Sequence, residues 1–490
     1  MDVSADVLGF VIIIYIYLIA VVVKSKKYGL YVIFTIAFMM GILNIVGIPN
    51  LFTRFAFESL VVILFTKSLF VAQKRSHVNY NSFGAYYVVA LLVVSVGSFF
   101  ANNVHFVGFL YYLRMVFVYF LLFYAFLNTQ YTSSEIRKIN KFIFFLFLIQ
   151  LPASLIKYNI VGQIEDIAIG TMEISAGSLN ALIPMFVSSY LLSAYFYKRK
   201  MINIFLMLAF VLFGIIGNKR ALIVYLPLIF MILYFLYTIG YRKEKRQLSK
   251  RNIVVNFTIC AIIGFGAIYA SARLIPTLNP EGEIGGSFNL EYVMEFSESY
   301  TTRYSTKNPH ELGRLKAPEI TYKVLKEGGF GIILLGLGAG DIVHSRFDPD
   351  SKNARLKKYG LGYGSGTGLL WMFIQIGIIG SLIFLLFYLK LVLRIYKIWL
   401  HSNNLETNIR SLSFLGMTAV FFIDFTTYST GFMTSNVLMG VYFYLAAIIL
   451  KEPSNKKLIT STSSQPKPIP SWDHNVPNRY QPRNTEIPLQ

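Results

Sequence analysis

Ionisable and polar side chains gather in residues 297–381, one long stretch of a chain that is otherwise largely apolar. Arginines of this stretch could bind an anionic substrate, and its acids and histidine could move a proton. The candidates are Arg303, His310, Glu311, Arg314, Glu319 and Asp341. A solvated connecting loop is the alternative, but loops beyond about 15 residues are usually functional or disordered. The aromatic residues and the LLGLGAG run are not typical of disorder, so the stretch is predicted to carry chemistry.

The roles within this stretch stay open. Histidine at position 310 is more often an ordinary loop residue than a base, and Glu298 lies near the other acids. Asp341 follows the GLGAG run, whose glycine backbone could approach a ligand closely. The run lacks the strand–turn–helix setting of a dinucleotide-binding fingerprint. No His, Asp and Glu cluster has metal-ligand spacing, so we predict a reaction without a metal or cofactor.

Arg220 and Lys219 lie in GIIGNKRALIVY, a very tight turn between two apolar segments. A guanidinium grips phosphate oxygens with two parallel hydrogen bonds. At the membrane boundary it would meet the headgroup of a lipid whose tail stays in the bilayer. The alternative is an arginine that anchors a helix end by extending towards water. We favour function, because ionisable residues in membranes are functional candidates by default.

Arg114 lies several residues inside an apolar segment, where an unpaired charge costs roughly 3 kcal/mol or more. It must therefore face the bundle interior, where it either pairs with a carboxylate or holds an anion. Arg54 and Glu58 have the spacing of an ion pair within one helix. Lys67, near a helix end, is expected to extend towards water. Asp424 admits both a structural and a functional interpretation.

The composition predicts an integral membrane protein. Of 490 residues, 55% are hydrophobic and 14% charged, and the mean hydropathy is +0.56, whereas soluble proteins have about 25% charged residues. About thirteen segments reach the length of a span. We predict an all-α, polytopic transmembrane helix bundle of about 12–14 spans with one large extracytoplasmic loop. The single cysteine, Cys260, excludes a disulfide framework.

The distribution of basic residues predicts the orientation. The net charge of +21 comes largely from short basic connections after the odd-numbered spans, and cytoplasmic loops collect Lys and Arg. This explains the charge without nucleic acid and predicts an N-terminus outside and a C-terminus inside. The polar loop 157–178 then faces the same side as the large loop. The expected parts are N-terminal spans 1–273, the extracytoplasmic loop 274–368, C-terminal spans 369–450, and a proline-rich, disordered cytoplasmic tail 451–490.

Three sequence blocks resemble the Wzy-type O-antigen and capsule polymerases, which share a superfamily with the O-antigen ligases. GNKRALIVYLPL resembles the family's arginine at the outer start of a helix, here Arg220. GRLKAPEITYKVLKEGGFGIILLGLGAGD resembles its loop arginine, helix and Gly-rich turn, here Arg314 and 336–340. GTGLLWMFIQIGIIGSLIF resembles the helix that returns into the membrane with Gly-x-x-Gly. Asn180, near the start of a span, is similar to the family's outer asparagine.

The resemblance implies a metal-independent integral glycosyltransferase in the bacterial cytoplasmic (inner) membrane. It would join undecaprenyl-diphosphate-linked oligosaccharide units on the outer face, making O-antigen, capsule or exopolysaccharide. Boundary arginines would stabilise the charge that develops on the lipid diphosphate. His310, Glu311 or Glu319 would take the proton of the acceptor hydroxyl. Besides the lipid-linked substrate and the bilayer, a chain-length regulator and a flippase are the expected partners.

Two other functions compete with polymerisation. An O-antigen ligase would transfer finished polymer to a lipid core, and a transporter or flippase would move lipid-linked oligosaccharide. Ligases commonly carry a histidine just before the returning helix, where this chain reads Gly364–Ser365–Gly366–Thr367. A transporter needs polar residues along a path through the bundle, whereas the charges here cluster at one side. Both observations favour the polymerase.

Overall fold

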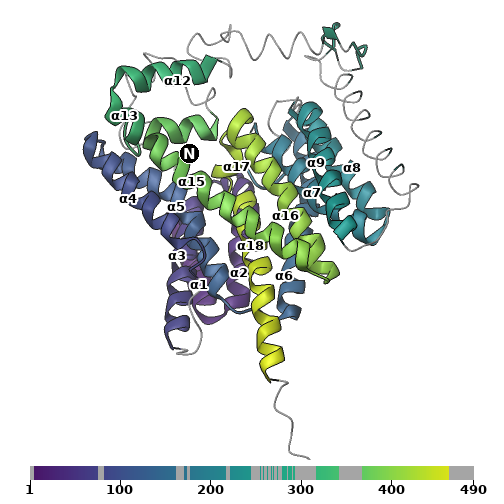
Figure 1. Ribbon diagram of the computed structural model, residues 1–490, viewed down its shortest axis with the longest axis horizontal. Coiled ribbons are helices and arrows are strands. Elements are labelled where there is room, and N and C mark those ends of the chain that lie inside the picture. The colour runs from purple at the N-terminus through teal and green to yellow at the C-terminus, as the bar shows by residue number, and fades with distance from the viewer. Residues whose placement is uncertain are drawn as a thin grey trace, which may run out of the picture. The chain divides into compact units, whose positions relative to one another are not determined.

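The protein is described by a computed structural model that places residues 5–74, 82–161, 170–173, 177–216, 221–243, 316–341 and 367–462, with scattered positions between 254 and 292 (Figure 1). The described elements are helical, and no strand occurs among them. They are α1 (Ala5–Lys24), α2 (Lys26–Ile45), α3 (Asn50–Lys74), α4 (Ala85–Ala101), α5 (Phe106–Asn128), α6 (Ser133–Val161), α7 (Leu179–Lys198), α8 (Ile202–Ile216), α9 (Ala221–Lys243), α12 (Lys316–Glu327), α13 (Phe330–Leu335), α15 (Gly368–His401), α16 (Leu405–Ile423), η3 (Asp424–Tyr428), α17 (Gly431–Thr434) and α18 (Asn436–Thr462).

The predicted all-α membrane bundle is confirmed. Six helices in the described part are long and apolar enough to cross a membrane, and five further apolar helices are shorter. Large apolar side chains such as Val93, Phe100 and Leu382 are exposed on the helix surfaces. In water that exposure would be unfavourable, whereas lipid acyl chains cover it without loss. The number of spans stays a prediction, because part of the chain lies outside the described residues.

The helices pack around α7 and α16, which contact each other extensively. On one side, α8 and α9 pack against α7, and on the other α15 joins α16 to α4 (Figure 1). A second group consists of α1, α2, α3 and α5, with α3 between α2 and α5. Most of α7 is buried, although it contains several serines. Small residues let helix backbones approach closely in membranes, so α7 can be the centre of the bundle.

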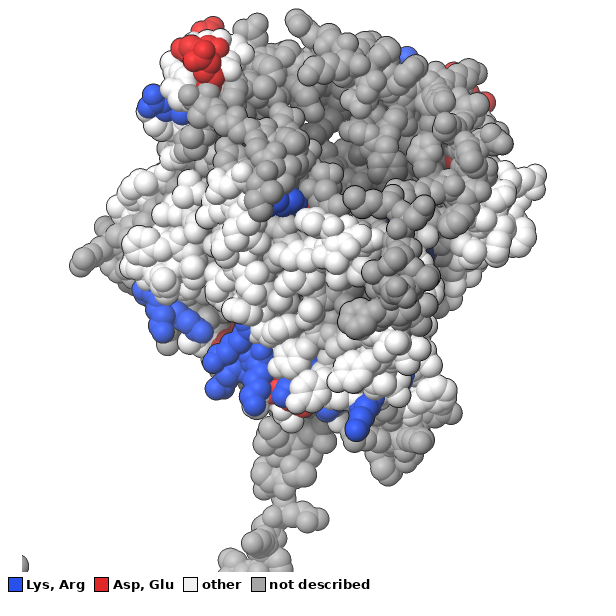
Figure 2. All heavy atoms as spheres, turned by 180° about the vertical axis from the view of Figure 1, so that it is seen from behind, with Lys and Arg blue, Asp and Glu red and all other residues white. Residues whose placement is uncertain are grey.

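Basic residues mark one end of the bundle. Lys26 donates to the carbonyl of Gln130, and Lys451 to those of Phe126 and Thr129, so the start of α2, the end of α5 and Lys451 meet there. Trp399 near the end of α15 donates to the Tyr197 hydroxyl at 3.0 Å, which brings the end of α7 to the same level as the end of α15. Figure 2 shows lysines and arginines gathered at this lower end. The basic connections that these contacts join thus share one end, and the side of the membrane that they face stays a prediction.

The first part of the predicted C-terminal tail is helical. The chain divides into a unit Met1–Lys451 and a second unit Glu452–Gln490, close to the predicted boundary between 450 and 451. However, α18 continues to Thr462, so the first residues of the predicted disordered tail are helical. The rest of the predicted tail lies outside the described residues.

Candidate functional site

Three polar segments lie at the end of the bundle opposite the basic connections. Residues 170–173 cap the end of α2, where the Gly41 N–H donates to the Thr171 carbonyl at 2.8 Å. Residues 336–341 pack against the end of α4 and the start of α5. Residues 424–435 contact the start of α15. We call these three segments the loop end. The loop 157–178 and the large loop 274–368 are predicted to share one side. Residues 170–173 of the first loop and 336–341 of the second both belong to the loop end.

Asn180 lies in the first turn of α7 and is fully buried. Neither its amide oxygen nor its amide nitrogen has a hydrogen-bond partner among the described residues. An unpaired buried amide costs about 1–3 kcal/mol, so it requires an explanation. Asn180 lies near the end of α8 and the start of α9. A Cβ at Gly214 would lie 2.9 Å from the Asn180 backbone carbonyl oxygen and would also overlap Leu222 of α9. Its unbonded amide therefore belongs to a residue near the point where α9 begins, at Ala221, and a part for Asn180 in substrate binding stays a prediction.

Asp424 organises the turn beside the start of α15. It begins the π-helix η3, and π-helical turns often occur at functional sites. Its Oδ1 accepts from the Ser429 hydroxyl at 2.5 Å, and its Oδ2 accepts from the Phe432 N–H at 2.7 Å. The Ser429 carbonyl in turn accepts from the Gly368 N–H at 3.1 Å. These bonds give Asp424 a structural role, because it holds α17 against the first residue of α15.

Arg114 pairs with a carboxylate, which is one of the two possibilities that the sequence left open. Its Nε lies 2.7 Å from Glu58 Oε1, which joins α5 to α3. The Arg114 side chain is 25% exposed and that of Glu58 is 17% exposed, and the guanidinium lies 5.0 Å from the Tyr111 ring centre. Glu58 thus pairs with Arg114 rather than with Arg54 on its own helix. A part for Arg114 in substrate binding stays a prediction.

Residues 170–173 are held between α2 and α6 by buried polar groups. Gln150 Oε1 accepts from the Thr171 N–H at 2.7 Å, and Lys157 donates to the Glu173 carbonyl at 2.7 Å. Burial raises the pKa of the Glu173 carboxyl, while Arg54 and Lys157 oppose that rise. From the sequence, residues 157–178 are predicted only as a polar loop, with no role for Glu173. A lysine at the end of an apolar segment, followed by an acidic loop, was the signal that could have revealed this contact.

The glycine-rich segment 336–341 packs closely against α15 and α5, and this packing explains why it needs glycine. Gly377 interrupts α15 with φ 63° and ψ −165°, and the Ile374 carbonyl before this break accepts from the Leu337 N–H at 2.7 Å. Gln375 Oε1 accepts from the Gly340 N–H at 2.8 Å. Gly340 also lies so close to Gly108 that a side chain on either residue would overlap the other's backbone. The expected close approach is therefore to other backbone atoms of this chain.

Two further candidates belong to this region. The Asp341 N–H donates to the Gly338 carbonyl at 3.0 Å, so Asp341 closes the glycine-rich turn. Glu319 lies on the outer face of α12, 2.7 Å from Lys323, and its side chain is 61% exposed. Such a pair between exposed helix residues contributes little to stability. For neither residue does the geometry decide a catalytic role, so both roles stay predictions.

Most of the predicted catalytic residues lie outside the described residues. They are Arg220, His310, Glu311 and Arg314, and the predicted substrate-binding residues Lys219 and Arg303 also lie outside these ranges. Within the described ranges, no group of three or more His, Cys, Asp or Glu residues could hold a metal ion. The predicted independence of metal and cofactor therefore stays a prediction for the whole chain.

Comparison with known proteins assigns no family to the chain. No protein-family model matches the sequence, and no curated protein matches it. The resemblance to the polymerases therefore depends on the three short blocks and on the hydropathy pattern, and the function that follows from it is a proposal.

Proposed function

We propose that the protein is an integral-membrane polysaccharide polymerase. It would transfer a growing oligosaccharide from undecaprenyl diphosphate to the next lipid-linked repeat unit, on the outer face of the bacterial cytoplasmic membrane. The observation that carries the proposal is the buried, unbonded amide of Asn180 near the start of α9, the helix that follows Arg220 in the sequence. A lipid diphosphate is an anion held in the bilayer, and hydrogen-bond donors at the membrane boundary suit it.

The chemistry fits the residue types that the sequence offers. The acceptor hydroxyl attacks the anomeric carbon of the donor sugar, and the bond from that carbon to the diphosphate oxygen breaks. The diphosphate leaves with the bonding electrons, and Arg220 and Arg314 are the proposed stabilisers of its charge. The acceptor proton passes to a base of the loop, for which His310, Glu311 and Glu319 are the candidates.

The first experiment is a reaction with purified components. The protein in nanodiscs is incubated with its undecaprenyl-diphosphate repeat unit and EDTA, and the products are separated on a gel. A ladder spaced by one repeat supports a polymerase that works without a divalent metal. Intact substrate in the presence of folded protein contradicts polymerase activity under these conditions. Product formed only after a lipid-core acceptor is added would identify a ligase instead.

Variants then test the site. Arg220→Ala and Arg314→Ala should abolish the ladder while leaving the protein inserted. Arg394→Ala is the matched control, because Arg394 is exposed on α15 towards the basic end and should leave the ladder unchanged. Asn180→Leu should reduce polymer without lowering thermal stability, since removing an unpaired buried amide is nearly neutral or stabilising. Unchanged polymer length in both arginine variants would contradict the proposed site.

A further inference from the structure

The short helix α13 exposes its apolar residues at the loop end. It reads FGIILL, and none of its residues is buried. Phe330 at its start is 75% exposed, and Ile332, Ile333, Leu334 and Leu335 are partly exposed. In water an apolar surface of this kind would be unfavourable. Something apolar should therefore cover α13.

The position of α13 is set by contacts with two membrane helices. The Leu335 carbonyl accepts from the Ser98 hydroxyl of α4 at 2.6 Å. Leu334 lies directly against Gly377, where α15 is interrupted. After α13, Leu337 binds the Ile374 carbonyl of α15. These contacts place α13 beside the last turn of α4 and the interrupted part of α15.

The neighbouring surface of α4, α5 and α15 is also apolar and exposed. Phe100 at the end of α4 is 70% exposed and Phe106 at the start of α5 is 59% exposed. Ile378 and Ile379, next to the interruption of α15, are 38% and 37% exposed. Because α15 is one of the six helices suited to cross the membrane, this surface is continuous with the lipid-facing surface of the bundle. The apolar face of α13 extends it.

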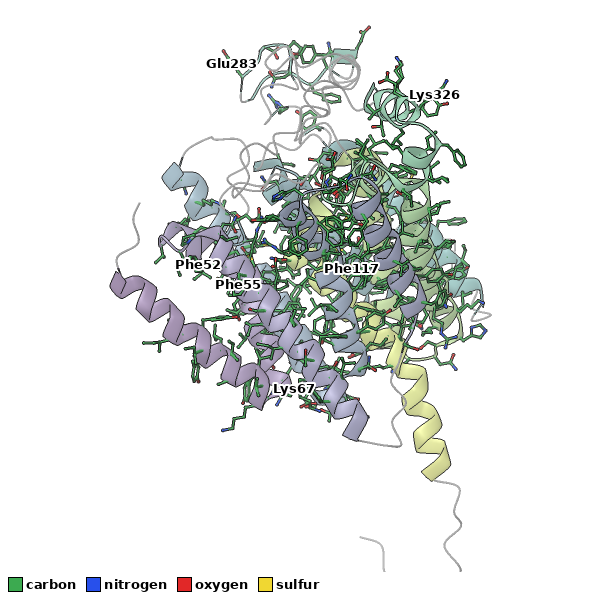
Figure 3. The ribbon with its side chains drawn as sticks, turned by 90° about the vertical axis from the view of Figure 1, so that its left-hand side faces the viewer. Phe52, Phe55, Lys67, Phe117, Glu283 and Lys326 are labelled. Atoms are coloured by element: carbon green, nitrogen blue, oxygen red, sulfur yellow. The ribbon has the colours of Figure 1, made fainter. Side chains whose placement is uncertain are left out.

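The preceding helix α12 exposes polar and amphipathic side chains instead of apolar ones. Thr321, Val324 and Leu325 are buried on one face, whereas Tyr322 is 62% exposed. The Lys326 ammonium lies 6.0 Å from the Tyr322 ring centre. Figure 3 shows Lys326 on this helix, at the other end of the molecule from Lys67. Tyrosine and lysine side chains are typical of the membrane–water interface.

We propose that α13 lies among the lipid acyl chains of the leaflet at the loop end and holds α12 at headgroup level. The partner is the bilayer itself, since the exposed face of α13 continues the surface that lipid already covers. This anchor would keep residues 316–341 at the membrane surface, close to where a lipid-linked molecule presents its headgroup. It does not depend on which reaction the protein catalyses.

Site-directed fluorescence tests this placement. Cys260, the single cysteine of the sequence, is replaced by serine, and Phe330→Cys is labelled with an environment-sensitive dye in liposomes. Phe100→Cys on α4 is the lipid-facing control, and Glu319→Cys on α12 is the aqueous control. The Phe330→Cys dye should emit as far to the blue as the Phe100→Cys dye. Lipids brominated on their acyl chains should quench both dyes but not the dye at Glu319→Cys.

Each other outcome would overturn the proposal. A dye at Phe330→Cys that emits as in water, without quenching by brominated lipid, would show that α13 faces solvent. Blue-shifted emission without quenching would show that another protein segment covers it. Gly331→Cys provides a second labelling site if Phe330→Cys does not fold, because a Cβ there meets nothing within 4 Å. Monodisperse elution in detergent is the folding criterion for every variant.

Discussion

Replacing Gly377 with alanine should detach the glycine-rich segment 336–341 from α15. Gly377 has φ 63° and ψ −165°, a conformation that is essentially restricted to glycine. An added Cβ would overlap the Leu334 carbonyl and would lie 2.6 Å from the Gly336 nitrogen. Both neighbours are backbone atoms, so no side chain can rotate away to relieve the clash.

The expected loss in stability follows from two contributions. The backbone conformation costs a residue with a Cβ about 1–3 kcal/mol, and the overpacking typically adds about 1–3 kcal/mol. The total is roughly 2–6 kcal/mol. If α15 straightens to avoid this, the Ile374 carbonyl becomes an intrahelical acceptor and Leu337 loses its 2.7 Å hydrogen bond. Either way, segment 336–341 should open more often.

Hydrogen exchange measured by mass spectrometry on the detergent-solubilised protein is the assay. A loss of about 2 kcal/mol corresponds to roughly 30-fold faster exchange in peptides that cover residues 336–341. Gly331→Ala is the matched control, because its Cβ meets nothing within 4 Å. Unchanged exchange in Gly377→Ala would refute the view that this glycine fixes the segment. Equally fast exchange in Gly331→Ala would show that any substitution near α13 loosens it.

Two further predictions concern buried charge. Glu58→Ala or Arg114→Ala should each destabilise the protein by about 1.5–3 kcal/mol, because a charge-assisted hydrogen bond is lost. In thermal unfolding, the double variant should lose less stability than the sum of the two single losses, and strict additivity would argue against the pair. Burial raises the pKa of Glu173, so stability should be greatest below the ordinary glutamate pKa of about 4.3 and fall as pH rises through the raised value. Arg54 and Lys157 oppose this effect without reversing it. Glu173→Gln should remove this fall in stability from the pH–stability profile. An unaltered slope would show that other groups cause the fall.

Hydropathy predicted the helices well because the information is local. A segment of about 20 apolar residues must hydrogen-bond its own backbone in lipid, and a helix does so without help from other segments. The expected spans 179–197 and 369–395 correspond to α7 (Leu179–Lys198) and α15 (Gly368–His401). Loop charge likewise predicted which connections share one end of the bundle, since that follows from the alternation of consecutive spans.

The partners of the polar residues depend on contacts between segments that are far apart in the sequence. The glycines at 336 and 340 could have served a ligand or another part of the backbone. Only the packing of Gly340 against Gly108 and of Gly336 against Gln375 showed that neighbouring backbone requires them. For Arg114 the sequence allowed a carboxylate partner without naming it, and the packing of α3 against α5 places Glu58 2.7 Å away. The sequence by itself determined an all-helical membrane protein, because lipid acts on each segment separately. Only the tertiary structure decided which charges are paired and which buried amide stays unbonded, because those depend on how the helices pack together.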